Sequence, residues 1–242
     1  MTEYRVYSST TDVEPFALHA TAAVTRYLDQ PLTNGTIYYY YVTAFAGSES
    51  ARSNIANAQP YAITPYTYTT NVTCSGVPDC ANAGGQPDGA AANVSGPGVL
   101  TLDFGAGHGI IDGLGPDMVF YEWPATVDVG AGPEPGIMLD YAFIDLSADG
   151  TTWYRVFAWD SIAGGIVGTN IDCYATDACG TCPGECEDEP IPSRDLYGAP
   201  FQTGIAIDIS MTPPGYSYRY VRFTYPPGGT QGAQVDTVQR LH

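Results

Sequence analysis

The sequence contains no lysine and only eight arginines. With 26 acidic residues, its formal net charge is −18. Nucleic acids and anionic membranes are bound through basic patches, so this charge balance argues against both as partners. Charged residues make up only 14% of the chain, so its surface has to be formed largely by uncharged polar residues, glycine and tyrosine. Such a surface is typical of a secreted β-sandwich rather than of a cytosolic enzyme.

Long apolar stretches are also missing, since no run approaches the roughly 18 residues of a membrane-spanning helix. We therefore expect no membrane insertion. The first residues, MTEYRVYSS, have neither the basic start nor the apolar core of a signal peptide. If the protein is extracellular, as its composition indicates, we expect this chain to be a processed or excised piece of it.

Recognisable catalytic motifs are absent as well. The chain has no G-x-S-x-G elbow, no P-loop and no HExxH zinc motif, and His108 in GAGHGI is typical of an ordinary turn. A glycosidase needs two facing carboxylates, and Glu122 with Asp140 or Asp145 is a pair of that type. Because any acidic β-protein contains such pairs, we predict that the protein is not an enzyme.

Six cysteines fall into two groups, and an even number is typical of disulfides in an oxidising compartment. We predict that all six are oxidised and that Cys74 pairs with Cys80. A zinc site on the four cysteines of the second group is the alternative, although their spacing is irregular. This group consists of Cys173, Cys179, Cys182 and Cys186.

Alternation of polar and apolar residues predicts an all-β protein in two parts. The first part is residues 1–60, and the proline- and tyrosine-rich residues 61–67 form a semi-rigid linker after it. In the last of its strands, the side chains expected to point inward are those of Tyr38, Tyr40, Val42 and Ala44. The strands expected in this part are 4–9, 16–23, 25–32 and 36–47.

The second part, residues 68–242, shows the same alternation and no long amphipathic helical pattern, which excludes a parallel α/β sheet. Asp149-Gly150 is typical of a two-residue hairpin turn in which both residues have positive φ. Residues 160–202 are expected to be an irregular insertion held by disulfides. The strands expected are 98–104, 117–123, 137–147, 151–159, 203–210, 216–225 and 233–241.

Residues 103–123, DFGAGHGIIDGLGPDMVFYEW, combine many glycines with carboxylates five positions apart at Asp112, Asp117 and Glu122. Glycine lets a backbone fold tightly and turn its carbonyl oxygens toward an ion, and Ca²⁺ takes oxygen ligands of this kind. The segment therefore predicts a structural Ca²⁺ site, provided that the chain bends at Pro116 so that the three side chains converge. The alternative is an acidic surface turn.

Aromatic residues in the second part favour binding by stacking, because flat rings offer apolar and CH–π contact to sugar rings. The candidate ligand-binding residues are Trp159, Tyr121 and Tyr154. Trp153 is expected in the core, and Trp159 is expected to be the more exposed of the two tryptophans. The expected partner is a glycan or another cell-surface polymer.

The segment Leu32-Thr-Asn-Gly-Thr-Ile-Tyr38 and the strand after it resemble the tyrosine corner and sixth strand of a fibronectin type III domain. The resemblance covers roughly residues 3–60. It implies a sandwich that lacks its first two strands and the tryptophan of the second. Either the chain is truncated here or another surface covers the open face, and the second case implies self-association through the incomplete module.

Four motifs of the second part resemble the galactose-binding-like jelly rolls of bacterial cell-surface proteins and carbohydrate-binding modules. They are DGLGPDMVFYEW (112–123), AFIDLSADGTTWYRV (142–156), YRYVRFTY (218–225) and QVDTV (234–238). The resemblance implies a second β-sandwich with structural Ca²⁺ on Asp112, Asp117, Glu122 and Asp236. The cysteine-rich insertion and His108 depart from the pattern of the family.

These observations predict an extracellular, non-catalytic protein made of two β-sandwich units, an incomplete fibronectin type III-like module and a jelly roll. The predicted function is recognition of a carbohydrate or a cell surface, with Ca²⁺ as a structural cofactor. A structural subunit of a surface layer or an extracellular filament is the alternative.

Overall fold

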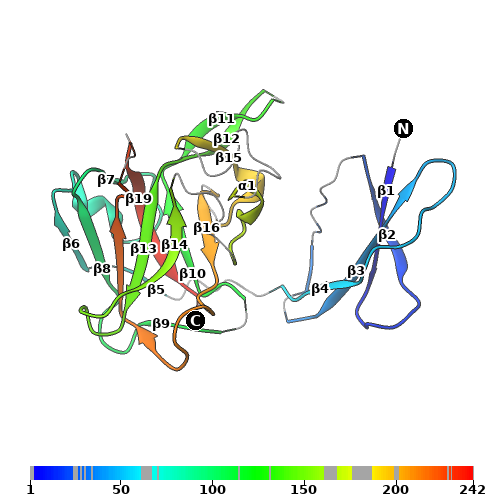
Figure 1. Ribbon diagram of the computed structural model, residues 1–242, viewed down its shortest axis with the longest axis horizontal. Coiled ribbons are helices and arrows are strands. Elements are labelled where there is room, and N and C mark those ends of the chain that lie inside the picture. Colours follow the sequence, from blue (N-terminus) through cyan, green and yellow to red (C-terminus); the bar gives the residue numbers. More distant parts are fainter. Residues whose placement is uncertain are drawn as a thin grey trace. The chain divides into compact units, whose positions relative to one another are not determined.

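The computed structural model divides the chain into two compact units, Met1–Ile63 and Thr64–His242, both built from antiparallel strands (Figure 1). The predicted all-β class is confirmed, since the one α-helix among the described residues, α1 (Asp172–Ala175), is a single turn. None of the described helices is long and apolar enough to cross a membrane. The structure describes residues 3–23, 27, 29, 31–33, 35–60, 67–69, 71–113, 115–130, 132–160, 168–175, 187–198, 202–227, 229 and 231–241.

The smaller unit contains one four-stranded sheet in the order β2-β1-β3-β4. In its centre, Val6 lies opposite Ala20 of one neighbouring strand and Val42 of the other. Of the strand expected at 25–32, residues 25, 26, 28 and 30 lie outside the described part of the chain, and the four that are described do not belong to a strand. The strands are β1 (Glu3–Ser9), β2 (Ala17–Ala22), β3 (Tyr38–Phe45) and β4 (Ala56–Ala58).

The predicted inward face of β3 is wrong at its centre. Val42 is 36% exposed, whereas Thr43 beside it is buried. The Thr43 hydroxyl donates to Glu49 at 3.2 Å, and on the same face Tyr41 stacks on Tyr7 with ring centroids 4.8 Å apart. The side chains that cover this face, Glu49 and Tyr7, come from the loop after β3 and from β1. The alternation within β3 alone therefore does not reveal which of its faces is covered.

Two antiparallel sheets pack face to face in the larger unit. The β10 sheet has the order β16-β10-β19-β5, with β7 also paired to β19, and the β13 sheet has the order β14-β13-β18-β8-β6. Phe120 of the first contacts Phe157 and Phe223 of the second in the core. The strands are β5 (Thr67–Tyr68), β6 (Asn71–Ser75), β7 (Ala92–Val94), β8 (Val99–Asp103), β10 (Met118–Glu122), β13 (Ala142–Ser147), β14 (Tyr154–Trp159), β16 (Gly204–Ile207), β18 (Tyr220–Thr224) and β19 (Ala233–Arg240).

Two smaller sheets complete the larger unit, one with the order β11-β12-β15 and one that pairs β17 with β9. The single strand predicted at 137–147 is wrong, because the chain leaves one sheet after Leu139 and enters another at Ala142. The insertion at 160–202 is also less irregular than predicted, since β15 lies in it. The strands are β9 (Ile110–Ile111), β11 (Ala125–Asp128), β12 (Pro133–Leu139), β15 (Glu189–Pro192) and β17 (Ser217–Tyr218).

The turn between β13 and β14 is longer than the predicted two-residue turn. It covers residues 148–153, and only Gly150 of the Asp149-Gly150 pair has positive φ, at 76°. The carboxylate of Asp149 accepts hydrogen bonds of 2.8 Å from the amides of Thr151 and Thr152. The aspartate therefore shapes the turn through its side chain rather than through a left-handed backbone.

β14 also contains a bulge. Ile144 of β13 lies opposite Phe157, and the next residue, Asp145, lies opposite Arg155, so Val156 is an extra residue on β14. A bulge of this kind changes which side chains face the core on its two sides. Trp159 comes after the bulge and is fully buried.

The predicted pairing of Cys74 with Cys80 is confirmed, and this disulfide joins the end of β6 to a 3₁₀ turn, η1 (Cys80–Ala83). Closing so short a loop contributes on the order of 2 kcal/mol to stability in the chain-entropy account. Cys173 is disulfide-bonded as well. The other cysteines of the second group, Cys179, Cys182 and Cys186, lie outside the described residues.

Candidate functional site

Three separate segments bring Asp112, Asp117 and Asp208 together, and one carboxylate oxygen of each lies within 4.8 Å of the other two. Asp117 directly precedes β10, Asp112 directly follows β9, and Asp208 directly follows β16. These three residues are referred to as the aspartate cluster. The sequence predicts two of them but not Asp208, which is 91 positions from Asp117 and reaches it because β16 pairs with β10.

Main-chain amides hold the aspartate cluster in place. The two oxygens of Asp117, which is fully buried, accept hydrogen bonds from the amides of Gly113 at 2.7 Å and Ile209 at 2.9 Å. Asp208 accepts a bond of 2.8 Å from the amide of Ser210. Asp117 thus connects two loops, and the cluster offers the oxygen ligands that a hard cation such as Ca²⁺ prefers.

The other two predicted metal ligands do not join this cluster. Asp117 and Glu122 are separated by the length of β10, which is about 16 Å for five extended residues. Asp236 lies within β19, where its carboxylate accepts bonds from the amides of Asp88 at 3.3 Å and Gly89 at 2.9 Å. The predicted convergence fails because regular pairing of β10 begins at Met118, so a bend at Pro116 cannot turn Glu122 back.

Two of the three predicted ligand-binding aromatics are buried, and the prediction for these two is wrong. Trp159 lies opposite the buried Ala142 and is itself in the core, and Tyr121 is 2% exposed with its hydroxyl donating to Gln239 at 2.7 Å. Trp153, which was expected in the core, is half-buried instead, and the guanidinium of Arg222 lies 4.1 Å from its ring.

The third predicted residue, Tyr154, belongs to a cluster of three tyrosines. Its ring centroid lies 6.5 Å from that of Tyr216 and 6.0 Å from that of Tyr218, which are themselves 6.0 Å apart. Tyr218 is buried, whereas Tyr216 is 49% exposed. These residues are referred to as the tyrosine cluster. The alternation in YSYRY (216–220) is the sequence signal that could have indicated Tyr216.

The tyrosine cluster lies beside the aspartate cluster. β17 pairs with β9 so that Ser217 lies opposite Ile111, the residue before Asp112. Burial raises the pKa of Tyr218, and the negative charge of Asp112 adds to this effect, as expected for neighbouring groups. An exposed aromatic ring and several carboxylates therefore share one surface of the larger unit.

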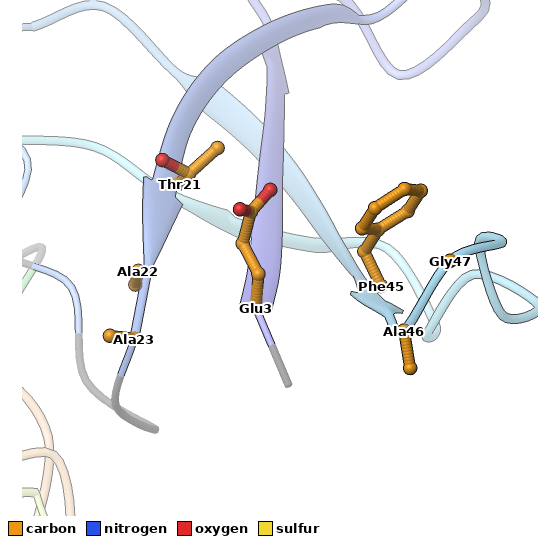
Figure 2. A pocket seen from close by; sticks show the side chains of 7 residues that line it. All are labelled: Glu3, Thr21, Ala22, Ala23, Phe45, Ala46 and Gly47. Carbon is orange, nitrogen blue, oxygen red and sulfur yellow. The ribbon is translucent and has the colours of Figure 1, made fainter. Parts of the chain in front are cut away.

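Hollows in the described surface are further candidate binding sites. A small one, of about 50 Å³, lies between β14 and the loop after β16 and includes Asp208 and the exposed Met211 in its lining. The larger one, of about 540 Å³, belongs to the smaller unit (Figure 2). Its one ionisable lining side chain, Glu3, is paired with Arg5. The aspartate and tyrosine clusters therefore offer more groups that could bind a ligand than the larger hollow does.

No protein-family model matches the chain, and no curated protein matches it in sequence. The function of the site has to be inferred from its own geometry.

Proposed function

We propose that the larger unit is an extracellular, non-catalytic module that binds a carbohydrate or another cell-surface polymer through the tyrosine cluster. The observation that carries the proposal is the exposed ring of Tyr216, which is supported by Tyr154 and Tyr218 beside the aspartate cluster. An aromatic face offers apolar contact to a sugar ring, and nearby carboxylates accept hydrogen bonds from its hydroxyl groups.

Tyr216→Ala is expected to weaken glycan binding at least tenfold, because a central aromatic anchor typically contributes more than about 1.4 kcal/mol. A glycan array would identify the ligand, and calorimetry with that ligand would measure the loss. Trp123→Ala is the matched control, since Trp123 is similarly exposed but follows β10 at the opposite end from the aspartate cluster. Equal losses in the two variants, or none in Tyr216→Ala, would contradict the proposal.

Structural Ca²⁺ at the aspartate cluster is part of the same proposal. Its support is the approach of three carboxylates from three segments in a chain with a net charge of −18. An ion that binds only the folded state stabilises it by about 2.7 kcal/mol at a hundredfold excess over its dissociation constant. We expect chelator to lower the melting temperature and Asp112→Asn to reduce that response. A response of unchanged size in Asp112→Asn would exclude the aspartate cluster.

Assembly into a surface layer or filament is the second candidate function, and the smaller unit favours it. Among the described residues of this unit, five large aliphatic side chains are more than one-third exposed, and the outer strands β2 and β4 have one paired neighbour each. Burial of such surface is worth about 25 cal/mol per Å², and an open strand edge can accept a further strand. The exposed residues are Val13, Leu18, Ile37, Val42 and Ile55.

The full chain is therefore expected to self-associate as its concentration rises, which analytical ultracentrifugation would measure. Val42→Glu should weaken this association because it places a charge on the open face of β3. Met211→Glu, at an exposed position of the larger unit, is the control and should have no effect. Strong hydrogen-exchange protection of residues 36–46 in a dilute monomeric sample would show that the smaller unit is closed by itself.

A further inference from the structure

A second group of carboxylates lies at the opposite end of β10 from the aspartate cluster. Glu122 ends β10, Asp140 lies where the chain crosses from β12 to β13, and both side chains are only 1% exposed. β12 pairs with β15 so that Leu139 lies opposite Glu189, which brings the preceding residue, Asp188, toward Asp140. Glu122, Asp140 and Asp188 are referred to as the acidic centre.

The acidic centre contains three buried oxygens without a hydrogen-bond partner, which are Oε2 of Glu122 and both carboxylate oxygens of Asp140. The other oxygen of Glu122 accepts a bond of 2.5 Å from the amide of Gln234. The side chains of Asp188 and Gln234 approach Asp140 but do not reach hydrogen-bond geometry with its oxygens. Buried carboxylates without donors are strongly unfavourable, so this arrangement lacks a positively charged or donating group.

None of the described arginines supplies a positive charge to the acidic centre, and the chain contains no lysine. Arg240 lies opposite Met118, at the far end of β10 from Glu122. The other described arginines pair with carboxylates outside the acidic centre. These arginines are Arg5, Arg52, Arg155, Arg194, Arg219 and Arg222.

We propose that the acidic centre binds one Ca²⁺ ion, with Asp140 and Glu122 as buried ligands and Asp188 as the third carboxylate. Ligands that are all oxygen suit a hard cation, and Ca²⁺ accepts six to eight of them in irregular geometry, whereas Mg²⁺ requires a near-ideal octahedron. The ion would connect the end of β10, the crossing between β12 and β13, and the segment before β15. This site is separate from the aspartate cluster and does not depend on glycan binding.

The electrostatics of the centre agree with this assignment. Burial raises the pKa of Asp140 to about 7, and the charges of Asp188 and Glu187 add to the effect. Burial also raises the pKa of Glu122, and the charge of Asp140 adds to it. A bound dication would offset both the lost hydration and the mutual repulsion of these groups.

The test is a Ca²⁺ titration of the full chain after removal of metal by chelator, followed by calorimetry and thermal unfolding. It uses the Asp112→Asn variant, so that the aspartate cluster does not contribute. We expect remaining Ca²⁺ binding and a rise in melting temperature of about 5–10 °C at a hundredfold excess over the dissociation constant. Adding Asp140→Asn should abolish both the binding and the rise in melting temperature.

Without metal, the Asp140→Asn variant should unfold at the same or a higher temperature, because a neutral amide replaces an uncompensated carboxylate.

Asp145→Asn is the matched control, because Asp145 is a buried carboxylate whose oxygens already accept hydrogen bonds from Arg155 and Arg222. It should lower the melting temperature without metal and leave the Ca²⁺-induced rise unchanged. The proposal is overturned if Asp112→Asn shows no Ca²⁺ response, or if adding Asp140→Asn leaves that response intact. The first result would mean that protons, rather than a metal, neutralise the acidic centre.

Discussion

Replacement of Trp159 by alanine is expected to lower the free energy of unfolding of the larger unit by about 3–5 kcal/mol. Trp159 is fully buried and lies opposite Ala142, on the same face of the β13 sheet as Ile144. Loss of the indole removes its burial and leaves a cavity that the two packed sheets can close only in part. Urea unfolding followed by circular dichroism would measure the change without depending on tryptophan fluorescence.

Trp123→Ala is the matched control for this prediction. Trp123 is 46% exposed, and its indole N–H donates to the carbonyl oxygen of Gly89 at 2.8 Å. Loss of one partly exposed hydrogen bond is expected to cost about 1 kcal/mol or less. Similar losses in the two variants would mean that Trp159 does not lie in the packed core.

Removal of both arginines that neutralise Asp145 is expected to cost about 3–5 kcal/mol, because it leaves a buried carboxylate without a cation. Asp145 lies on β13 with a side chain that is 5% exposed. Arg222 of β18 donates to it at 2.9 Å, and Arg155 of β14 donates to its other oxygen. The register places both arginines directly opposite Asp145, one on each neighbouring strand.

The effect of the double variant is expected to exceed the sum of the single variants. Arg155→Met and Arg222→Met should each cost about 1 kcal/mol, because the remaining arginine still compensates the charge. Methionine keeps most of the apolar part of each arginine side chain. In the native protein the guanidinium of Arg155 lies over the ring of Phe143, and that of Arg222 lies over the ring of Trp153. Adding Asp145→Asn to the double variant should recover part of the loss. Additive single effects in urea unfolding would show that Asp145 is hydrated rather than buried.

Several features of this protein follow from neighbouring residues alone. Polar–apolar alternation is a property of each strand, so it is sufficient to predict the all-β class. The Cys74–Cys80 disulfide follows from two cysteines six positions apart in a loop-forming segment. Asp112 and Asp117 meet because the glycine-rich chain between them is short enough to bring them to one place.

Other features depend on which strands pair and in which register. The bulge at Val156 is defined only by the partner strand, and it puts Trp153 and Trp159 on opposite faces although residues six positions apart share a face in a regular strand. Asp208 joins the aspartate cluster only because β16 pairs with β10. The acidic centre arises in the same way, since pairing of β12 with β15 brings Asp188 to Asp140.

The physical reason for this division is the range of the interactions. Turn geometry, disulfide loops and strand periodicity act over a few residues, so each leaves a pattern in the local sequence. Strand partners and bulges are chosen by packing between residues that are tens of positions apart, and many pairings are compatible with the same alternation. Local sequence therefore determined the kind of structure that each segment forms, and only tertiary pairing decided which carboxylates and aromatic rings share a site.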